Sequence, residues 1–325
     1  MANVLLTLAE EVDQTTENHF AVRYPVDEYD CFDFANGFKE LGHHVYFINW
    51  RDLDFETSRA VRMFSDNEKR FVDPLPIAAF DVAFVYKMEG FLFNVPRFWE
   101  MVSLFERQCA VVVNHPDTIR HNINKSYVWQ LAAKGVRCPQ TFAIGPEVHE
   151  KLSRGEKLVL KPMCAERGYG AKLVQSLDAL QEIAGLEEQY LAQEYLPEIR
   201  DGERSLAFLG FQFEHAVIKK PSRSQPQEFR CNDSLGGTVE VYHPTDEELE
   251  YAVSVLRTYE SFGCPVHFSR VDFVNGARGP ILIEAELLNP SIYANTSKLG
   301  QHFGRRIANY FQTLISAASP AISMR

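Results

Sequence analysis

Residues 267–291 read HFSRVDFVNGARGPILIEAELLNPS, and this stretch decides the fold. Residues 268–274 alternate like a β-strand, Asn275-Gly276 begins a turn, and residues 281–287 form the expected return strand. Pro290 ends that second strand. The stretch therefore predicts an antiparallel hairpin.

The hairpin carries four charged residues whose side chains face the same way. Side chains two residues apart on a strand point to one face, and an even shift of register keeps them there. If Val274 pairs with Leu282, the charged residues also lie opposite one another. The pairs that this register predicts are Asp272 with Glu284 and Arg270 with Glu286.

Three carboxylates on one strand face repel one another, and a buried charge needs a partner or a metal. Carboxylate oxygens suit Mg²⁺, which takes its remaining ligands from water and substrate phosphates. The expected ligands are Asp272, Glu284 and Glu286, with a further oxygen from Asn289. A solvated strand face with one Arg–Glu pair explains the same residues, and the hairpin by itself favours neither reading.

Two lysines lie beside loops that could bind phosphate. Lys161 ends the apolar strand LVLKP and precedes MCAERGYGAK, where Gly168 and Gly170 leave backbone N–H groups accessible. No G-K-[ST] follows, so this is not a Walker A motif. Lys125, in NHPDTIRHNINKSYVWQLAAKGV, lies near a helix start, where the helix dipole disfavours a cation unless an anion binds. A tight turn with exposed lysines is the alternative.

Polar residues also gather between the glycine loop and the hairpin. In YLAQEYLPEIRDGERS, Glu203 follows a strand that ends near Leu196, and such carboxylates bind ribose hydroxyls. The segments HAVIKKP and EFRCN supply Lys219, Arg230 and Asn232, which together would clamp a phosphate or an oxyanion. Scattered surface charge is the alternative for each segment taken singly.

The first third of the chain alternates strands and helices, which predicts a parallel α/β sheet. No G-x-G-x-x-G follows the first strand, so a dinucleotide-binding fold lacks its fingerprint. The expected strands are residues 3–8, 45–49, 81–86 and 110–114, and the expected helices are 32–41 and 96–106. From about residue 139 a small α+β unit follows, with strands 157–160, 173–175 and 190–194 and a helix at 177–183. Residues 221–228 form an expected loop.

Composition excludes several classes of protein. The 325 residues carry a net charge of −11, whereas a nucleic-acid-binding surface is basic. The short apolar N-terminus lacks a basic region, and the chain has no run of about 18 apolar residues, so neither a signal peptide nor a membrane span is expected. Six cysteines form no C-x-x-C pair, which indicates reduced thiols and a cytoplasmic protein. Cys164 is interpreted as a filler of its loop and not as a nucleophile.

The order of these motifs resembles the ATP-grasp superfamily over about residues 111–296. The most similar groups are bacterial glutathione synthetase and the ATP-grasp cyclo-ligase of the D-cycloserine pathway. Two departures limit the likeness. The last motif is Glu284-Ala285-Glu286 and not E-x-N, a form associated with the cycloserine-type branch. Ser205 stands where glutathione synthetase has a substrate-binding arginine, which puts glutathione as product in doubt.

The resemblance implies a role for each matched position. The residues that bind ATP are Lys125, Lys161, the lid residues Gly168, Tyr169 and Gly170, the adenine hinge Gln193, Glu194, Tyr195 and Leu196, and the ribose acid Glu203. The residues around the transferred phosphoryl group are Lys219, Arg230, Asn232 and Arg270. The Mg²⁺ ligands are Asp272, Glu284, Glu286 and Asn289, and Mn²⁺ could replace Mg²⁺.

The resemblance also implies an architecture and a reaction. The expected fold is α/β, with an N-terminal parallel-sheet domain at 1–113 and an ATP-grasp domain at 114–325 whose lid covers about 139–197. The expected reaction joins a small carboxylate to an amine, an amino acid or short peptide, through an acyl phosphate. Ring closure within one substrate and ATP binding without turnover are the alternatives. The acceptor pocket is expected to draw on residues 10–30 and 86–93. A homodimer is expected, because dimers are the commonest soluble homo-oligomers.

Overall fold

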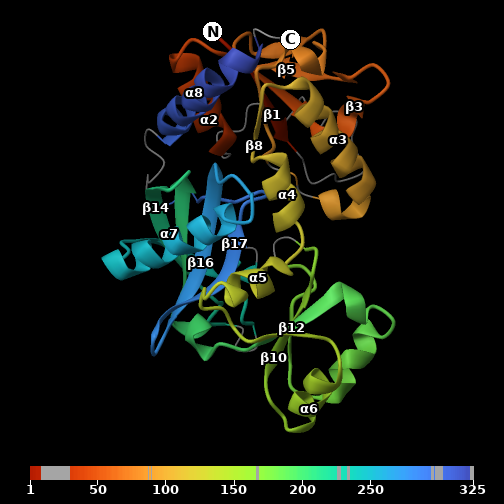
Figure 1. Ribbon diagram of the computed structural model, residues 1–325, viewed down its shortest axis with the longest axis vertical. Coiled ribbons are helices and arrows are strands. Elements are labelled where there is room, and N and C mark those ends of the chain that lie inside the picture. The colour runs from red at the N-terminus through yellow and green to blue at the C-terminus, as the bar shows by residue number, and fades with distance from the viewer. Residues whose placement is uncertain are drawn as a thin grey trace. The chain divides into compact units, whose positions relative to one another are not determined.

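The computed structural model describes residues 1–8, 30–86, 88, 90–165, 168–224, 228–232, 235–293, 296 and 303–322. The chain forms two compact units. Unit 1 comprises Met1–Pro116 together with Leu288–Arg325, and unit 2 comprises Asp117–Leu287 (Figure 1). By packing, residues 288–325 group with unit 1, whereas the expected division places them in the second domain. The expected domain boundaries stay a prediction.

Unit 1 contains a six-stranded sheet in the order β6-β5-β2-β1-β7-β8. Its strands are β1 (Asn3–Leu8), β2 (His44–Asn49), β5 (Met63–Ser65), β6 (Arg70–Val72), β7 (Val82–Phe84) and β8 (Val111–Val113). The four strands β2, β1, β7 and β8 are parallel, as predicted. The antiparallel pairs β2–β5 and β5–β6 correct the expectation of an all-parallel sheet. These short edge strands carry too few residues for a periodic pattern to reveal them.

Helices cover this sheet and explain its apolar strands. Helix α2 (Asp30–Glu40) packs beside α8 (Phe303–Ile322), and α3 (Val95–Gln108) lies elsewhere on the sheet (Figure 1). Phe34 contacts Phe303, and Phe38 contacts Phe311, with ring centroids 5.6 and 5.4 Å apart. The remaining elements are the β3–β4 hairpin (Leu53–Asp54, Arg59–Ala60) and the 3₁₀ helices η1 (Trp50–Asp52), η2 (Ile77–Ala79) and η3 (Phe91–Asn94).

Unit 2 begins with two short helices and a four-stranded antiparallel sheet in the order β11-β10-β12-β9. The strands are β9 (Thr141–Ala143), β10 (Leu158–Pro162), β11 (Lys172–Val174) and β12 (Tyr190–Glu194). The helices are α4 (Pro116–Asn122), α5 (Tyr127–Ala133) and α6 (Pro146–Ser153), and η4 (Leu177–Ile183), η5 (Glu187–Gln189) and η6 (Pro197–Asp201) are 3₁₀ helices. The predicted helix at 177–183 therefore has the right bounds, but it is a 3₁₀ helix.

A five-stranded antiparallel sheet in the order β15-β14-β13-β16-β17 forms the rest of unit 2. Its elements are β13 (Glu203–Leu209), β14 (Gln212–Lys220), β15 (Thr238–Tyr242), helix α7 (Asp246–Glu260), β16 (Phe268–Gly276) and β17 (Gly279–Glu286). One face packs against α5 and α7 through a core that includes Leu206, Val271 and Ala285. The opposite face carries the charged residues of the hairpin, because side chains alternate along each strand.

Candidate functional site

The hairpin pairs as predicted at its charged end. Arg270 lies opposite Glu286 and Asp272 lies opposite Glu284. The predicted pairing of Val274 with Leu282 is wrong, because Val274 lies opposite Ile281 and Phe273 lies opposite Leu282. One residue of β17, Ile283, has no partner in the ladder and forms a β-bulge. A bulge shifts the pairing on one side only, so Arg270 and Asp272 still pair with Glu286 and Glu284 as predicted. Bulges are common beside functional sites.

Asp272 is fully buried, and two cations hold its carboxylate. Arg270 donates from Nε to Oδ1 and from a terminal nitrogen to Oδ2, each at 2.8 Å. Lys219 Nζ lies 3.2 Å from Oδ2. Burial alone would raise the pKa of Asp272, but the charges of Arg270 and Lys219 outweigh burial and hold this pKa well below its ordinary value. The carboxylate is therefore ionised and ready to bind a cation.

Lys219 joins Asp272 to a second buried carboxylate. Glu203 lies opposite Lys219 in the β13–β14 ladder, and Glu203 Oε1 accepts a hydrogen bond from Lys219 Nζ at 3.0 Å. Burial raises the pKa of Glu203, and the nearby charge of Asp272 raises it further against the lowering effect of Lys219. Glu203 is thus part of the buried charge cluster. Its expected contact with ribose stays a prediction.

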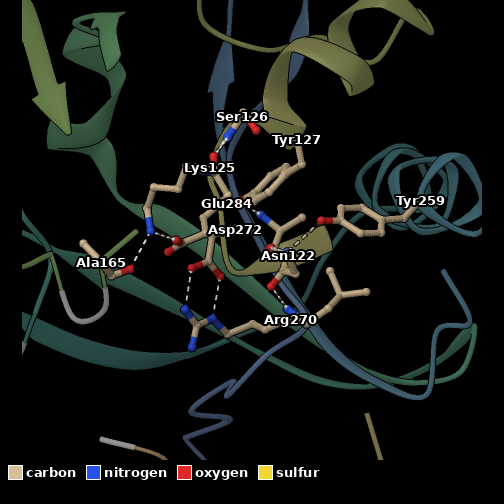
Figure 2. Close-up of polar contacts among 12 residues, drawn as sticks. Asn122, Lys125, Ser126, Tyr127, Ala165, Tyr259, Arg270, Asp272 and Glu284 are labelled. Atoms are coloured by element: carbon tan, nitrogen blue, oxygen red, sulfur yellow. Dashed lines mark hydrogen bonds and ion pairs between the residues drawn. The ribbon is translucent and has the colours of Figure 1, made fainter. Parts of the chain in front are cut away.

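Glu284 is held by Lys125, which comes from the segment before α5 (Figure 2). Lys125 Nζ lies 3.2 Å from Glu284 Oε1 and donates to the carbonyl of Ala165 at 2.6 Å. The backbone N–H of Lys125 also donates to Met163 at 2.7 Å. Burial would raise the pKa of Glu284, and Lys125 is the main cause that lowers it instead. Three segments far apart in sequence therefore meet at Lys125.

Lys161 lies in β10 and faces the same charges. Leu158 and Leu160 of the same strand pack into the apolar core of the four-stranded sheet, so the side chain of Lys161 points to the other face of that sheet. Burial lowers the pKa of Lys161, and the charge of Glu284 opposes that shift while Lys125 adds to it. Among the described residues, the Lys161 ammonium makes no hydrogen bond or ion pair. A partly buried cation that makes no direct ion pair is a place where a phosphate would bind favourably.

Three residues that the sequence did not single out hold these elements together (Figure 2). Asn122 donates to the carbonyl of Ala285 at 2.7 Å and accepts from the N–H of Leu287 at 2.8 Å. It also donates to Tyr259 Oη at 2.9 Å, and Tyr127 Oη accepts from the N–H of Ala285 at 3.1 Å. The bonds to Ala285 and Leu287 hold the strand directly after Glu284. No local pattern marks them, because each joins positions more than 130 residues apart.

Two carboxylates, those of Asp272 and Glu284, lie opposite each other and are the candidate metal ligands. Among the described residues, no group of three or more His, Cys, Asp or Glu side chains could hold a metal ion. Mg²⁺ is often held by one or two carboxylates, with phosphates and waters completing its six ligands. Asp272 and Glu284 fit that requirement, since both are ionised. Glu286 lies opposite Arg270, one level away, and Asn289 belongs to unit 1.

The glycine loop approaches the segment that carries Arg230. Gly168 and Gly170 both have φ near +70°, which favours glycine. A methyl group on Gly168 would lie 3.2 Å from Arg230 Cδ and 3.4 Å from Asn232 Oδ1. Tyr169 is exposed between the two glycines. The expected lid residues are therefore adjacent to two of the expected phosphoryl-binding residues.

The predicted hinge lies beside an apolar cluster. Gln193 is buried and donates to Thr141 Oγ1 at 3.0 Å, whereas Glu194 is exposed. Leu196 is buried and Tyr195 packs beside it. The other members of the cluster are Ile199, Cys231, Val274, Ile281 and Ile283. Such an apolar surface is suited to a flat heteroaromatic ring.

Two further expectations have different outcomes. Cys164 is exposed, and partial burial of its thiol raises its pKa, although Lys125 opposes the shift; a reactive thiol has a lowered pKa. Residues 10–29, expected to line the acceptor pocket, lie outside the described residues. In the other expected stretch, Phe91 is buried and Phe93 is 82% exposed. The acceptor pocket stays a prediction.

Known proteins are similar to this chain in sequence. The family profile described as a RimK-like ATP-grasp domain matches residues 128–310. Glutathione synthetase of Synechococcus elongatus is 27% identical over 199 residues, which are 59% of this chain and 58% of that protein. The match thus spans less than two thirds of that relative's length. A probable alpha-L-glutamate ligase of Chromohalobacter salexigens is 25% identical over 243 residues, 70% of this chain and 78% of that protein.

Solved structures share the fold. D-cycloserine synthetase DcsG matches with a TM-score of 0.72 at 17% identity, over 97% of this chain and all of that one. D-alanine–D-alanine ligase of Bacillus anthracis, solved with ATP, matches with a TM-score of 0.59 at 11% identity, over 99% of this chain and 100% of that one. At such identities the likeness establishes the ATP-grasp fold. Across the described residues, every helix is too short or too polar to cross a membrane.

Proposed function

Because the chain belongs to the RimK-like ATP-grasp family of ligases, we propose that it uses ATP to join a carboxylate to an amine. The observation that carries this proposal is the charge cluster on the face of β13, β14, β16 and β17 that is opposite α5 and α7. Asp272 and Glu284 lie opposite each other there, and each already contacts a cation. Cations and carboxylates alternating in this way suit a bound Mg²⁺ and a row of phosphates.

The charged residues of the cluster have separate roles in the proposed complex with ATP and metal. Lys125 and Lys161 bind the phosphates of ATP, and this role of Lys161 is supported because its ammonium makes no direct ion pair or hydrogen bond among the described residues. Asp272 and Glu284 hold Mg²⁺ or Mn²⁺, with Glu286 and Asn289 as further expected ligands. The metal, when bound, would neutralise charge on the phosphates. Arg270 and Lys219, which contact Asp272 in this structure, would supply positive charge to the transferred phosphoryl group.

The proposed reaction has two steps. A carboxylate oxygen of the substrate bonds to the γ-phosphorus of ATP while the bond from that phosphorus to the bridging oxygen breaks, giving an acyl phosphate and ADP. The amine nitrogen then bonds to the acyl carbon, phosphate leaves, and the nitrogen loses a proton. Lys219, Arg230, Asn232 and Arg270 neutralise the transferred group. Positioning and charge do the catalysis, so the protein needs no nucleophile of its own.

The lid and hinge complete the proposed site. The loop of Gly168, Tyr169 and Gly170 covers the phosphates and excludes water, which would hydrolyse the acyl phosphate. Residues 193–196 bind the adenine through backbone groups, with the apolar cluster beneath it, and Glu203 binds the ribose. The substrates are small, an amino acid or a short peptide on each side. A cytoplasmic location and a homodimer stay predictions.

An ADP-release assay tests the proposal. Purified protein with Mg·ATP is screened against pairs of amino acids and dipeptides, and the products are weighed by mass spectrometry. A product that equals two substrates minus one water supports ligation. A product that equals one substrate minus one water supports ring closure by the same chemistry. Tight ATP binding with no ADP release for any pair would instead indicate a protein that binds ATP without turnover.

A further inference from the structure

Arg230 is held in place by a neighbour that no motif above includes. Glu228 Oε1 accepts a hydrogen bond from Arg230 Nε at 2.9 Å, and Oε2 accepts from a terminal nitrogen at 2.7 Å. The same Oε1 also accepts from the backbone N–H groups of Phe229 and Arg230, at 3.1 and 2.9 Å. This carboxylate therefore fixes both the turn of the segment and the plane of the guanidinium.

The guanidinium that Glu228 holds also touches the lid loop. The other terminal nitrogen of Arg230 donates to the carbonyl of Gly168 at 3.3 Å. The methylene stem of Arg230 lies so close to Gly168 that a methyl group there would be 3.2 Å from Cδ. The left-handed backbone of Gly168 and this approach both require glycine. Arg230 thus forms a surface against which the lid loop rests.

A guanidinium has five N–H donors in one rigid plane. Glu228 uses the edge formed by Nε and one terminal nitrogen, and this choice turns the opposite edge toward the lid loop. If Glu228 were absent, the long side chain of Arg230 would rotate freely, and ordering it on ligand binding would cost rotamer entropy. Glu228 orders the side chain of Arg230 as the protein folds, so this entropy is lost before any ligand binds.

We propose that Glu228 is a positioning residue, which orients Arg230 so that it both receives the closing lid loop and points its outer edge at the transferred phosphoryl group. The second half of this inference rests on the proposed function. Glu228 acts by orientation and not by charge, because its negative charge would itself repel a phosphate. Its effect should therefore pass entirely through Arg230.

Kinetics of single and double variants test the inference. Glu228→Gln keeps the oxygen that caps the backbone but replaces the second acceptor by an amide, which cannot accept from Arg230. We expect kcat for ADP release to fall about 10- to 100-fold with little change in KM for ATP. Arg230→Met should cost at least as much, and Glu228→Gln in the Arg230→Met background should cost nothing more. Glu150→Gln, which breaks the exposed ion pair of Glu150 with Arg154 on α6, is the matched control.

Chymotrypsin gives a second readout that does not need turnover. Tyr169 in the lid loop is 66% exposed and Phe93 is 82% exposed. In the wild type, Mg²⁺ with the β,γ-imido analogue of ATP should protect the bond after Tyr169, while cleavage after Phe93 reports unchanged protease activity. In Glu228→Gln this protection should be lost, although the analogue still binds by calorimetry.

Each outcome decides a different claim. Wild-type kcat and protection in Glu228→Gln would overturn the inference while leaving the proposed function in place. A double variant slower than Arg230→Met would show that Glu228 acts on its own and would overturn it as well. If the wild type releases no ADP with any acid and amine, the proposed function fails, and the protection experiment still decides whether Glu228 positions the surface for the lid.

Discussion

Asp272 lies opposite Glu284 in the β16–β17 pairing, where Arg270 and Lys219 hold Asp272 and Lys125 holds Glu284. The pair is one residue from the bulge at Ile283, so the register changes just beyond it. Asp272 is fully buried and Glu284 is partly buried, so the neighbouring cations must stay in place for the fold to tolerate two ionised carboxylates at one level. The predictions below follow from this arrangement.

Asp272→Asn should remove metal-dependent turnover without unfolding the protein. The amide is neutral, so it binds Mg²⁺ weakly and leaves Arg270 and Lys219 without their common anion. We expect ADP release to fall by at least ~100-fold, the scale seen when one preorganised charge is removed from an active site. Circular dichroism checks the fold, and Mn²⁺ titration followed by electron paramagnetic resonance checks the metal. Asp201→Asn at an exposed carboxylate is the control, and full activity of Asp272→Asn would disprove the metal assignment.

Acid should abolish the stability that Asp272 provides. Its pKa in the folded protein is lowered below its ordinary value, which is near 3.9 in the unfolded chain. A lowered pKa stabilises the fold above the unfolded value, and this contribution is lost as pH falls toward the folded value. Urea unfolding of wild type and Asp272→Asn should give a constant difference above about pH 5 that shrinks below about pH 4. A difference that grows on acidification would contradict the prediction.

Lys161→Met should raise the stability of the fold and weaken the binding of ATP. The substitution removes a partly buried cation that makes no direct ion pair or hydrogen bond in the described part of the chain, so we expect the free energy of unfolding to rise by about 1 kcal/mol. ATP binding should weaken at the same time, because a phosphate loses its counter-charge. Urea unfolding and calorimetry with Mg·ATP measure the two effects. Lys134→Met at an exposed position is the control; a large loss of stability in Lys161→Met would mean that the lysine is already neutralised.

Cys164 should react with thiol reagents faster than Cys109 and Cys138. Burial raises the pKa of Cys109 and of Cys138 to about 12, so almost none of either thiol is ionised at pH 8. Cys164 is exposed and should react first with iodoacetamide, as judged by mass spectrometry of peptides. Mg·ATP should slow this labelling, because Cys164 lies beside Ala165, which binds Lys125. Cys164→Ser should keep full ADP release, and a loss of turnover would mean that the thiol takes part in the reaction.

Much of the fold could be predicted from local pattern. The strand at Asn3–Leu8 and the strand at Tyr190–Glu194 have the predicted bounds, and the charged pairs of the hairpin have the predicted register. The short antiparallel strands β5 and β6 were missed, because three residues are too few to show a period. The bulge at Ile283 was missed because nothing in the alternation of apolar residues marks one extra residue.

The sequence by itself determined the hairpin and the face on which its carboxylates lie. Strand alternation is a local rule, so spacing alone puts Asp272 and Glu284 on one face, whereas their pairing opposite each other depended on an assumed register. Only the tertiary structure decided which cations meet them. Lys125, Lys161 and Lys219 come from a loop and two different sheets, and their distance from a carboxylate depends on how those elements pack. Burial and neighbouring charge, which set each pKa, are likewise products of packing and not of spacing.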